Sequence, residues 1–313
     1  MKKIVTYIFS FSIIFTVLNY SIAASLSKLY NTNYEGQSGG KINDLVNNHK
    51  KVQILAIGDS RCAHHVVPDV LGPNNFNLSH NGMSLIFHTG LIDQIINNTD
   101  ISVDTILLNL DIQELIYSHD KKDFDIKQLK YFYGKNQWIT NKINALNFKE
   151  KYKFLISIYK WNGKTPTLIA NKGLKKNHAK NGYSPTLPTK RDSINVFWQW
   201  RKTNNNFLKN KFFSINNKCL EYLSHVNSLC LKNDITLICF ISPTYDQFEI
   251  LPRQINKIVD PLTKKNIIVL DYSNEFHNNK KLQEIWNWND VFHLNEKGAN
   301  ILSKKIRYDL NKI

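Results

Sequence analysis

Apolar and polar positions along the chain follow two periods, one typical of buried strands and one typical of helices. Short apolar runs that predict buried strands occupy residues 51–58, 74–79, 103–110, 235–242 and 266–273. Apolar residues at helical spacing predict helices near residues 83–96, 206–233, 246–265 and 295–310. Strands that alternate with helices predict a parallel sheet covered on both faces. We therefore expect an α/β fold, arranged as a three-layer α/β/α sandwich.

The stretch from residue 120 to about 205 breaks this alternation, since it is weak in strand pattern and rich in lysine, asparagine and aromatic residues. Residues 120–218 hold 22 Lys/Arg and 5 Asp/Glu, a net charge of +17, whereas the whole chain carries +16. We interpret the stretch as an insertion into the α/β domain. Its charge fits either a solvated surface or the binding of an anionic envelope glycan or membrane surface.

Aromatic residues of the insertion have two interpretations: they build a small core of their own, or they form a platform on which a sugar stacks. They are Tyr131, Phe132, Tyr133, Trp138, Tyr159, Trp161, Trp198 and Trp200.

The first 24 residues are typical of a targeting segment, because lysines at positions 2 and 3 precede an apolar run and small residues follow around Ala23. A cleaved signal peptide is one interpretation. An uncleaved anchor in the inner membrane is the other, because residues 4–24 approach the roughly 20 residues that span a bilayer. Both predict an exported protein, periplasmic or secreted, with residues 25–313 as one domain that contains the insertion at about 120–205.

The four cysteines, Cys62, Cys219, Cys230 and Cys239, are predicted to be free thiols. Cys219 and Cys230 lie on one predicted helix, roughly 16 Å apart at 1.5 Å per residue, which is too far for a disulfide. No C-x-x-C motif occurs, so the sequence indicates no cysteine metal site, and we expect neither a metal nor another cofactor.

The stretch "AIGDSRCAHH" places Ser60 directly after a predicted strand, behind Gly58 and Asp59. In open parallel sheets, ligands bind outside the carboxyl ends of the strands, so the Ser60 hydroxyl is predicted to face a cleft. Alone, this pattern is more typical of a helix N-cap than of a nucleophile.

The stretch "NDVFHLNEKGANIL" places Asp290 and His293 three residues apart, just before the last predicted helix. A nucleophilic serine needs a base to take its proton, and that base needs a carboxylate to orient it. We therefore predict a catalytic triad of Ser60, His293 and Asp290.

With these segments the chain resembles the SGNH (GDSL-type) hydrolase superfamily, over most of residues 51–110 and 206–310. "IGDSR" is similar to the first block of that family, "NLSHNGMS" to the second and "DVFHLNEKGANIL" to the last. The resemblance implies a flavodoxin-like parallel sheet, Ser60 as nucleophile, and an oxyanion hole to which Gly82 lends its backbone N–H.

The third block of the family, Gly-x-Asn-Asp, is replaced here by "NLDIQEL". Asp111 falls where the family has the asparagine that donates to the oxyanion, and Asn109 lies two residues earlier. An ionised carboxylate cannot donate a hydrogen bond. Either Asn109 substitutes, or Asp111 is held protonated, or activity is low or altered.

Three more residues are candidates for substrate binding: Arg61 beside the nucleophile, Asn81 beside Gly82, and Tyr245 after a predicted strand. His64 and His65 are interpreted as helix residues near the rim of the cleft.

The predicted function is that of a serine esterase that removes an acyl group from a cell-envelope glycan or lipid. An O-acyltransferase with the same triad and a non-catalytic protein that binds an anionic glycan remain alternatives. Nucleic acid is not an expected partner, because the basic residues form no recognisable binding motif and export is predicted.

Overall fold

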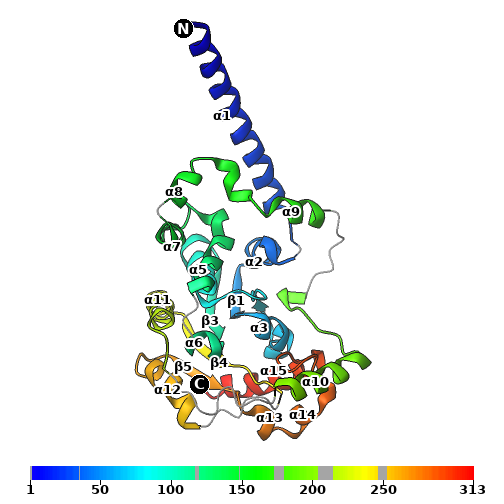
Figure 1. The fold of residues 1–313 in the computed structure, drawn as a ribbon. Coiled ribbons are helices and arrows are strands. Elements are labelled where there is room, and N and C mark those ends of the chain that lie inside the picture. Colours follow the sequence, from blue (N-terminus) through cyan, green and yellow to red (C-terminus); the bar gives the residue numbers. More distant parts are fainter. Residues whose placement is uncertain are drawn as a thin grey trace. The chain divides into compact units, whose positions relative to one another are not determined.

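The computed structural model describes residues 2–34, 36–116, 120–147, 149–172, 180–203, 214–245 and 252–313 (Figure 1). Contacts divide the chain into two compact units. The helical unit comprises Met1–Asp44 and Ile126–His178, and the sheet unit comprises Leu45–Asp125 and Ala179–Ile313. The predicted insertion is therefore divided: its first part groups with the N-terminal helix, and the part after residue 178 groups with the sheet.

Five parallel strands form the sheet, in the order β2-β1-β3-β4-β5. They are β1 (Lys51–Ile57), β2 (Asn75–Asn77), β3 (Ser102–Asn109), β4 (Thr236–Ile241) and β5 (Ile268–Asp271). This is the strand order of flavodoxin-like doubly wound sheets. The predicted α/β class and parallel sheet are confirmed, and each strand lies within the range that the apolar runs predict or within one residue of it.

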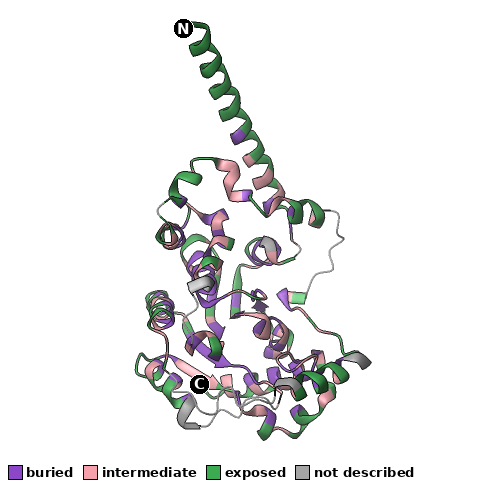
Figure 2. Cartoon of the chain, viewed as in Figure 1, coloured by how far each residue is buried: buried purple, intermediate pink, exposed green. Residues whose placement is uncertain are grey.

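Central strands are apolar on both faces because helices cover both faces of a parallel sheet. Leu55 and Ile57 of β1 and Ile106, Leu107 and Leu108 of β3 have no measurable exposure to solvent. Figure 2 shows this buried layer in purple.

Helices of the sheet unit form two packed groups. In one group, α5 (Leu85–Asn98) packs against α11 (Asn217–Lys232), and in the other α15 (Glu296–Leu310) packs against α3 (Ser60–His65) and α4 (Pro68–Leu71). This grouping is consistent with the three-layer arrangement. The remaining helical elements are η4 (Lys180–Gly182), α6 (Ile112–Ile116), α10 (Lys190–Thr203), α12 (Pro252–Thr263), α13 (Glu275–Asn278), α14 (Lys280–Gln283) and η5 (Ile285–Asn287).

The predicted helices 206–233 and 246–265 correspond to α11, which starts at Asn217 after the non-helical residues 214–216, and to α12, which is described from Pro252. Residues 206–213 and 246–251 of those predictions lie outside the described residues. The prediction of four free cysteines is confirmed, and all four are buried.

The helical unit packs around aromatic side chains. Its elements are α1 (Lys2–Asn31), η1 (Gly36–Gly40), α7 (Gln137–Leu146), α8 (Glu150–Lys153), η3 (Ser157–Trp161) and α9 (Thr165–Lys172); α2 (Lys41–Asn48) and η2 (Asp120–Phe132) include the boundaries between the units. Tyr131, Phe132 and Trp161 are buried, as the first interpretation of these aromatic residues predicts. Trp198 belongs to α10 and is exposed.

The N-terminal helix α1 is long and apolar enough to cross a membrane, by length and composition. Figure 2 shows it in green along most of its length, because few of its side chains touch the rest of the chain.

Candidate active site

The site lies at the carboxyl ends of β1 and β3, where the order of the sheet reverses. In doubly wound sheets this switch point opens a crevice, because the connections from the two strands leave towards opposite faces. Ser60 follows β1 by three residues and Asp111 follows β3 by two. Ser60 and Arg61 lie at the first of these ends, and Asn109 and Asp111 at the second, as the sequence predicts.

Ser60 is held at the start of α3 by its two predecessors. Asp59 caps the helix, because its Oδ1 accepts the backbone N–H of Arg61 at 2.9 Å. A side chain at Gly58 would put its Cβ 2.6 Å from the Cβ of Asn109 and 2.8 Å from that of Cys62. Only glycine therefore lets β1 approach β3 closely enough at this turn. Asp59 serves as the N-cap that the sequence offered as an alternative, and Ser60 remains available for chemistry.

Asp290 and His293 lie on a tight turn that Asp290 itself stabilises. Asp290 Oδ1 accepts the backbone N–H groups of Phe292 and His293 at 2.8 and 2.9 Å. The carbonyl of His293 accepts the N–H of Asn289 at 2.8 Å, which closes the turn from the other side. Buried Trp288 anchors its start through an Nε1–H donated to the Leu282 carbonyl.

The structure brings Ser60, His293 and Asp290 into one hydrogen-bonded row. Ser60 Oγ lies 2.8 Å from His293 Nε2, and His293 Nδ1 lies 2.8 Å from Asp290 Oδ2. Since Nδ1–H donates to the carboxylate, Nε2 is left to accept the Ser60 proton. Burial raises the pKa of Asp290, but its hydrogen bonds with His293 and the backbone of the turn prevail, so its pKa lies below the usual value. The carboxylate therefore stays charged beside the imidazole.

His65 fixes the turn that carries His293, and the sequence alone does not predict this role. Its Nε2 accepts the backbone N–H of Leu294 at 2.9 Å. Its carbonyl accepts the hydroxyl of Ser303 on α15, and that hydroxyl accepts the N–H of Val67. Burial, with the nearby His293 and Arg61, holds the pKa of His65 well below its usual value. A neutral His65 keeps Nε2 as an acceptor.

The turn that contains Gly82 rests against the end of β1 and against α3. His80 donates its backbone N–H to the carbonyl of Gly58 at 2.9 Å. Asn81 Nδ2 lies 3.2 Å from Nε2 of His64, whose Nδ1 bonds the Ser184 carbonyl at 2.7 Å. Gly82 itself has a φ of 71° and open space where a Cβ would stand. Through Asn81 this turn contacts α3, the helix that begins with Ser60.

The two candidate donors of the third strand are both engaged elsewhere. Asn109 is buried, and its amide donates to Ser242 Oγ at 3.2 Å and to the Phe240 carbonyl at 3.4 Å. Asp111 Oδ1 lies 2.7 Å from Nη2 of Arg61, which also lies 3.4 Å from Asp59 Oδ2. Although burial opposes the guanidinium charge, these two carboxylates raise the Arg61 pKa above its usual value. Arg61 is thus held by carboxylates, and Asp111 is a charged partner of Arg61.

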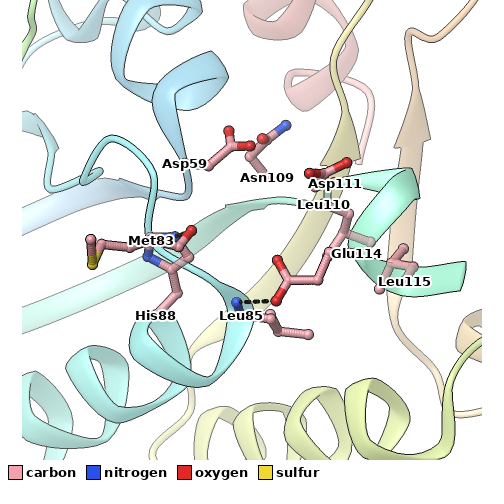
Figure 3. Close-up of a pocket in the computed structure, with 9 residues that line it drawn as sticks. All are labelled: Asp59, Met83, Leu85, His88, Asn109, Leu110, Asp111, Glu114 and Leu115. Carbon is pink, nitrogen blue, oxygen red and sulfur yellow. Dashed lines mark hydrogen bonds between the residues drawn. The ribbon is translucent and has the colours of Figure 1, made fainter. Parts of the chain in front are cut away.

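A small cavity opens beside these strand ends. Figure 3 shows Asp59, Asn109 and Asp111 along one side of it, with Met83 and, from the first turns of α5, Leu85 and His88 opposite. Glu114 crosses the cavity, because its Oε1 accepts the backbone N–H of Leu85 at 2.8 Å. The cavity therefore lies between the start of α5 and the segment that follows β3.

Tyr245 lies under the histidine turn. Its ring packs edge-on against Phe276 and Trp288, and its backbone N–H donates to the Val291 carbonyl at 2.9 Å. The structure thus places Tyr245 as a support of the turn between Asp290 and His293.

Within the described part of the chain, no group of three or more His, Cys, Asp or Glu side chains is arranged to hold a metal ion.

No protein-family model matches the chain, and no curated protein matches its sequence.

Proposed function

We propose that this protein is an exported serine hydrolase of the SGNH type, with Ser60 as nucleophile, His293 as base and Asp290 as the group that orients His293. One observation carries the proposal. Ser60 Oγ and Asp290 Oδ2 each lie 2.8 Å from His293, on opposite ring nitrogens, although Ser60 and His293 are 233 residues apart. A helix cap alone does not need a histidine on its hydroxyl.

The first half-reaction acylates Ser60. Ser60 Oγ attacks the ester carbonyl while His293 Nε2 takes its proton, and a tetrahedral oxyanion forms. His293 then returns that proton to the leaving alcohol as the ester C–O bond breaks. Asp290 stays ionised throughout and stabilises the imidazolium that forms between the two steps.

The second half-reaction removes the acyl group from Ser60. Water, or a sugar hydroxyl, gives its proton to His293 and attacks the acyl-enzyme, and the proton then returns to Ser60 Oγ. A water acceptor makes the protein an esterase, and a sugar hydroxyl makes it an O-acyltransferase. The proposed substrate class is an O-acylated glycan or lipid of the cell envelope.

The oxyanion hole is proposed to consist of backbone N–H groups. Those of Ser60 and Gly82 have no hydrogen-bond partner within the described residues. The third-strand donor of the SGNH family has no equivalent, because Asn109 bonds to β4 and Asp111 bonds to Arg61. Loss of one oxyanion donor lowers rates by about 10²–10³-fold, so we expect a slow enzyme.

The same engagement of Asn109 and Asp111 favours a second candidate function, a non-catalytic protein of the envelope that binds an anionic glycan. The two functions differ in whether Ser60 reacts.

The test is turnover of short-chain p-nitrophenyl esters by the full chain in detergent, beside Ser60→Ala, with a fluorophosphonate probe applied to both. Labelling and hydrolysis that Ser60→Ala abolishes support the esterase. Labelling without hydrolysis, followed by acyl transfer to an added oligosaccharide, supports the transferase. A folded chain that neither labels nor hydrolyses overturns the catalytic proposal and favours the binding protein.

A further inference from the structure

The N-terminal helix α1 is part of the folded helical unit at its carboxyl end. Tyr30 is 2% exposed and stacks on Tyr131 with ring centroids 4.1 Å apart and near Trp161 at 5.6 Å. Asn31 accepts the hydroxyl of Tyr131 at 2.9 Å. Because Tyr30 and Asn31 follow Ala24, these contacts fix the carboxyl end of α1 in the helical unit, and retention of the segment before Ser25 depends on contacts upstream of Ala24.

Contacts also reach upstream of the small residues where a signal peptide would be cut. Asn19 is 5% exposed, and its Oδ1 accepts the backbone N–H of Ile158 at 3.1 Å. The helix runs without a break from Lys2 through Ala23 and Ala24 to Asn31. Cleavage near Ala24 would remove Asn19 and take away this partner of η3.

The part of α1 before Asn19 is exposed and is not packed against the helical unit. Its large apolar side chains are exposed, from Ile4 at 62% to Leu18 at 53%. The stretch of 20 residues from 3 to 22 is about 30 Å long at 1.5 Å per residue, which equals the thickness of a bilayer's hydrocarbon core. Asn19 therefore lies near the end of that span.

Exposed apolar side chains lie next to this end of the span. Leu155 is 75% exposed, Ile156 45% and Tyr152 53%, and all three precede η3, which packs against α1 through Ile158. Exposed lysines flank them at positions 149, 151 and 153. Apolar tips among lysines are typical of segments that lie in the interface of an anionic membrane.

The charge of the helical unit agrees with this placement. Its sequence holds 16 lysines and 3 acidic residues, a net of +13 out of +16 for the whole chain. Basic segments next to a membrane span are attracted by anionic lipid headgroups.

From these contacts we propose that the helical unit seats the protein on a membrane: α1 is retained as a single span, and residues 149–156 lie in the interface of an anionic lipid bilayer. The inference is independent of the chemistry proposed for Ser60. Of the two interpretations of the N-terminal segment, this inference favours the uncleaved anchor over the cleaved signal peptide. It also assigns anionic lipid as the partner of the basic insertion.

The test places a fluorescent label at the interface of the full chain. Leu155→Cys is labelled with an environment-sensitive thiol dye in phosphatidylcholine–phosphatidylglycerol vesicles, since the four native cysteines are buried. Leu231→Cys on α11 is the matched control, because Leu231 is 65% exposed in the sheet unit. The unsubstituted chain reports background labelling.

We expect nitroxide-labelled lipids to quench the dye at residue 155, with a blue shift of its emission, and to leave the dye at residue 231 unchanged. The effect at residue 155 should weaken in pure phosphatidylcholine. Equal emission at both positions, or the same quenching without anionic lipid, overturns the interfacial assignment. The mass of the chain isolated from membranes should retain residues 2–24, and a mature chain that begins near Ser25 overturns the anchor.

Discussion

Nε2 of His65 accepts the backbone N–H of Leu294 at 2.9 Å, and this bond connects the helix that begins with Ser60 to the turn that carries His293. Ser60 begins α3 and His65 ends it, while Leu294 directly follows His293. Two hydrogen bonds therefore fix the position of His293 relative to Ser60. One joins the two side chains directly, and the other joins His65 to Leu294.

We predict that His65→Leu lowers kcat more than it raises KM, because the Leu294 N–H loses its acceptor and the turn is no longer fixed. The lost bond should also cost about 1–3 kcal/mol in the free energy of unfolding. His65→Gln, whose amide oxygen can accept the same N–H, should recover most of the activity. Equal kcat values for the two variants would show that His65 only fills space.

Asp290→Asn should lower kcat by about 10³–10⁴-fold, because an amide no longer holds the imidazole in the tautomer that leaves Nε2 as acceptor. Ester turnover measures the loss. Fluorophosphonate labelling of Ser60 should slow in parallel. Retained activity in a correctly folded Asp290→Asn chain would contradict the triad.

Asp111→Asn tests whether Asp111 serves Arg61. The change introduces an amide at the position where the SGNH family, which the chain resembles in sequence, has one. It also removes one carboxylate from a guanidinium that is only 12% exposed. We expect the free energy of unfolding to fall by about 1–3 kcal/mol, measured by urea denaturation. Asp104→Asn is the control on the same strand, because its bond to Lys51 is exposed and should matter by less than about 1 kcal/mol. An unchanged stability in Asp111→Asn would mean that Asp59 alone holds Arg61.

Acid should destabilise the sheet unit through His88. Burial lowers the pKa of His88 to about 4, so the folded protein keeps this ring neutral while the unfolded chain protonates it near pH 6.5. Its stabilising effect is complete above pH 6.5 and is lost as the pH falls towards 4, at about 1.4 kcal/mol per pH unit. Urea denaturation at pH 7 and pH 5 should differ less in His88→Gln than in the parent chain. A His88→Gln chain with the parental difference would contradict the assignment.

Gly298→Ala should destabilise the chain, although alanine ordinarily favours a helix over glycine. A Cβ at Gly298 would lie 2.2 Å from the carbonyl oxygen of Asn287, in the segment before the turn that carries Asp290 and His293. We expect a loss of about 1–3 kcal/mol from this overpacking, measured by thermal or urea unfolding. Lys304→Ala on the exposed side of α15 is the control and should be nearly neutral. A stabilised Gly298→Ala chain would show that the segment moves freely.

The sequence predicts the sheet because both faces of it are buried. Runs such as Lys51–Ile57 and Thr236–Ile241 are apolar over most of their length, so they can be recognised as buried strands from the sequence alone. It also predicts the row of Ser60, His293 and Asp290, because the chemistry of acyl transfer demands those three groups together.

Other parts of the site depend on partners that no local pattern specifies. His65 accepts a hydrogen bond from the backbone N–H of a residue 229 positions away. The sequence around a single buried histidine does not specify which group it bonds. The bond between Arg61 and Asp111 exists only because β1 and β3 are neighbours, with Ile57 opposite Leu108. Tyr30 and Trp161 meet in the helical unit for the same reason, since their contact requires the fold before it can be recognised.

The placement of the Asp290 turn after the last strand has a consequence for the order of synthesis. All five strands and Ser60 precede residue 290, so Ser60 is synthesised well before His293, its hydrogen-bond partner. The final helix, which packs against α3 and α4, is synthesised later still. Under the proposed mechanism, a chain that ends before residue 290 would carry Ser60 without its base, so Ser60 would gain its reactivity only at the end of synthesis.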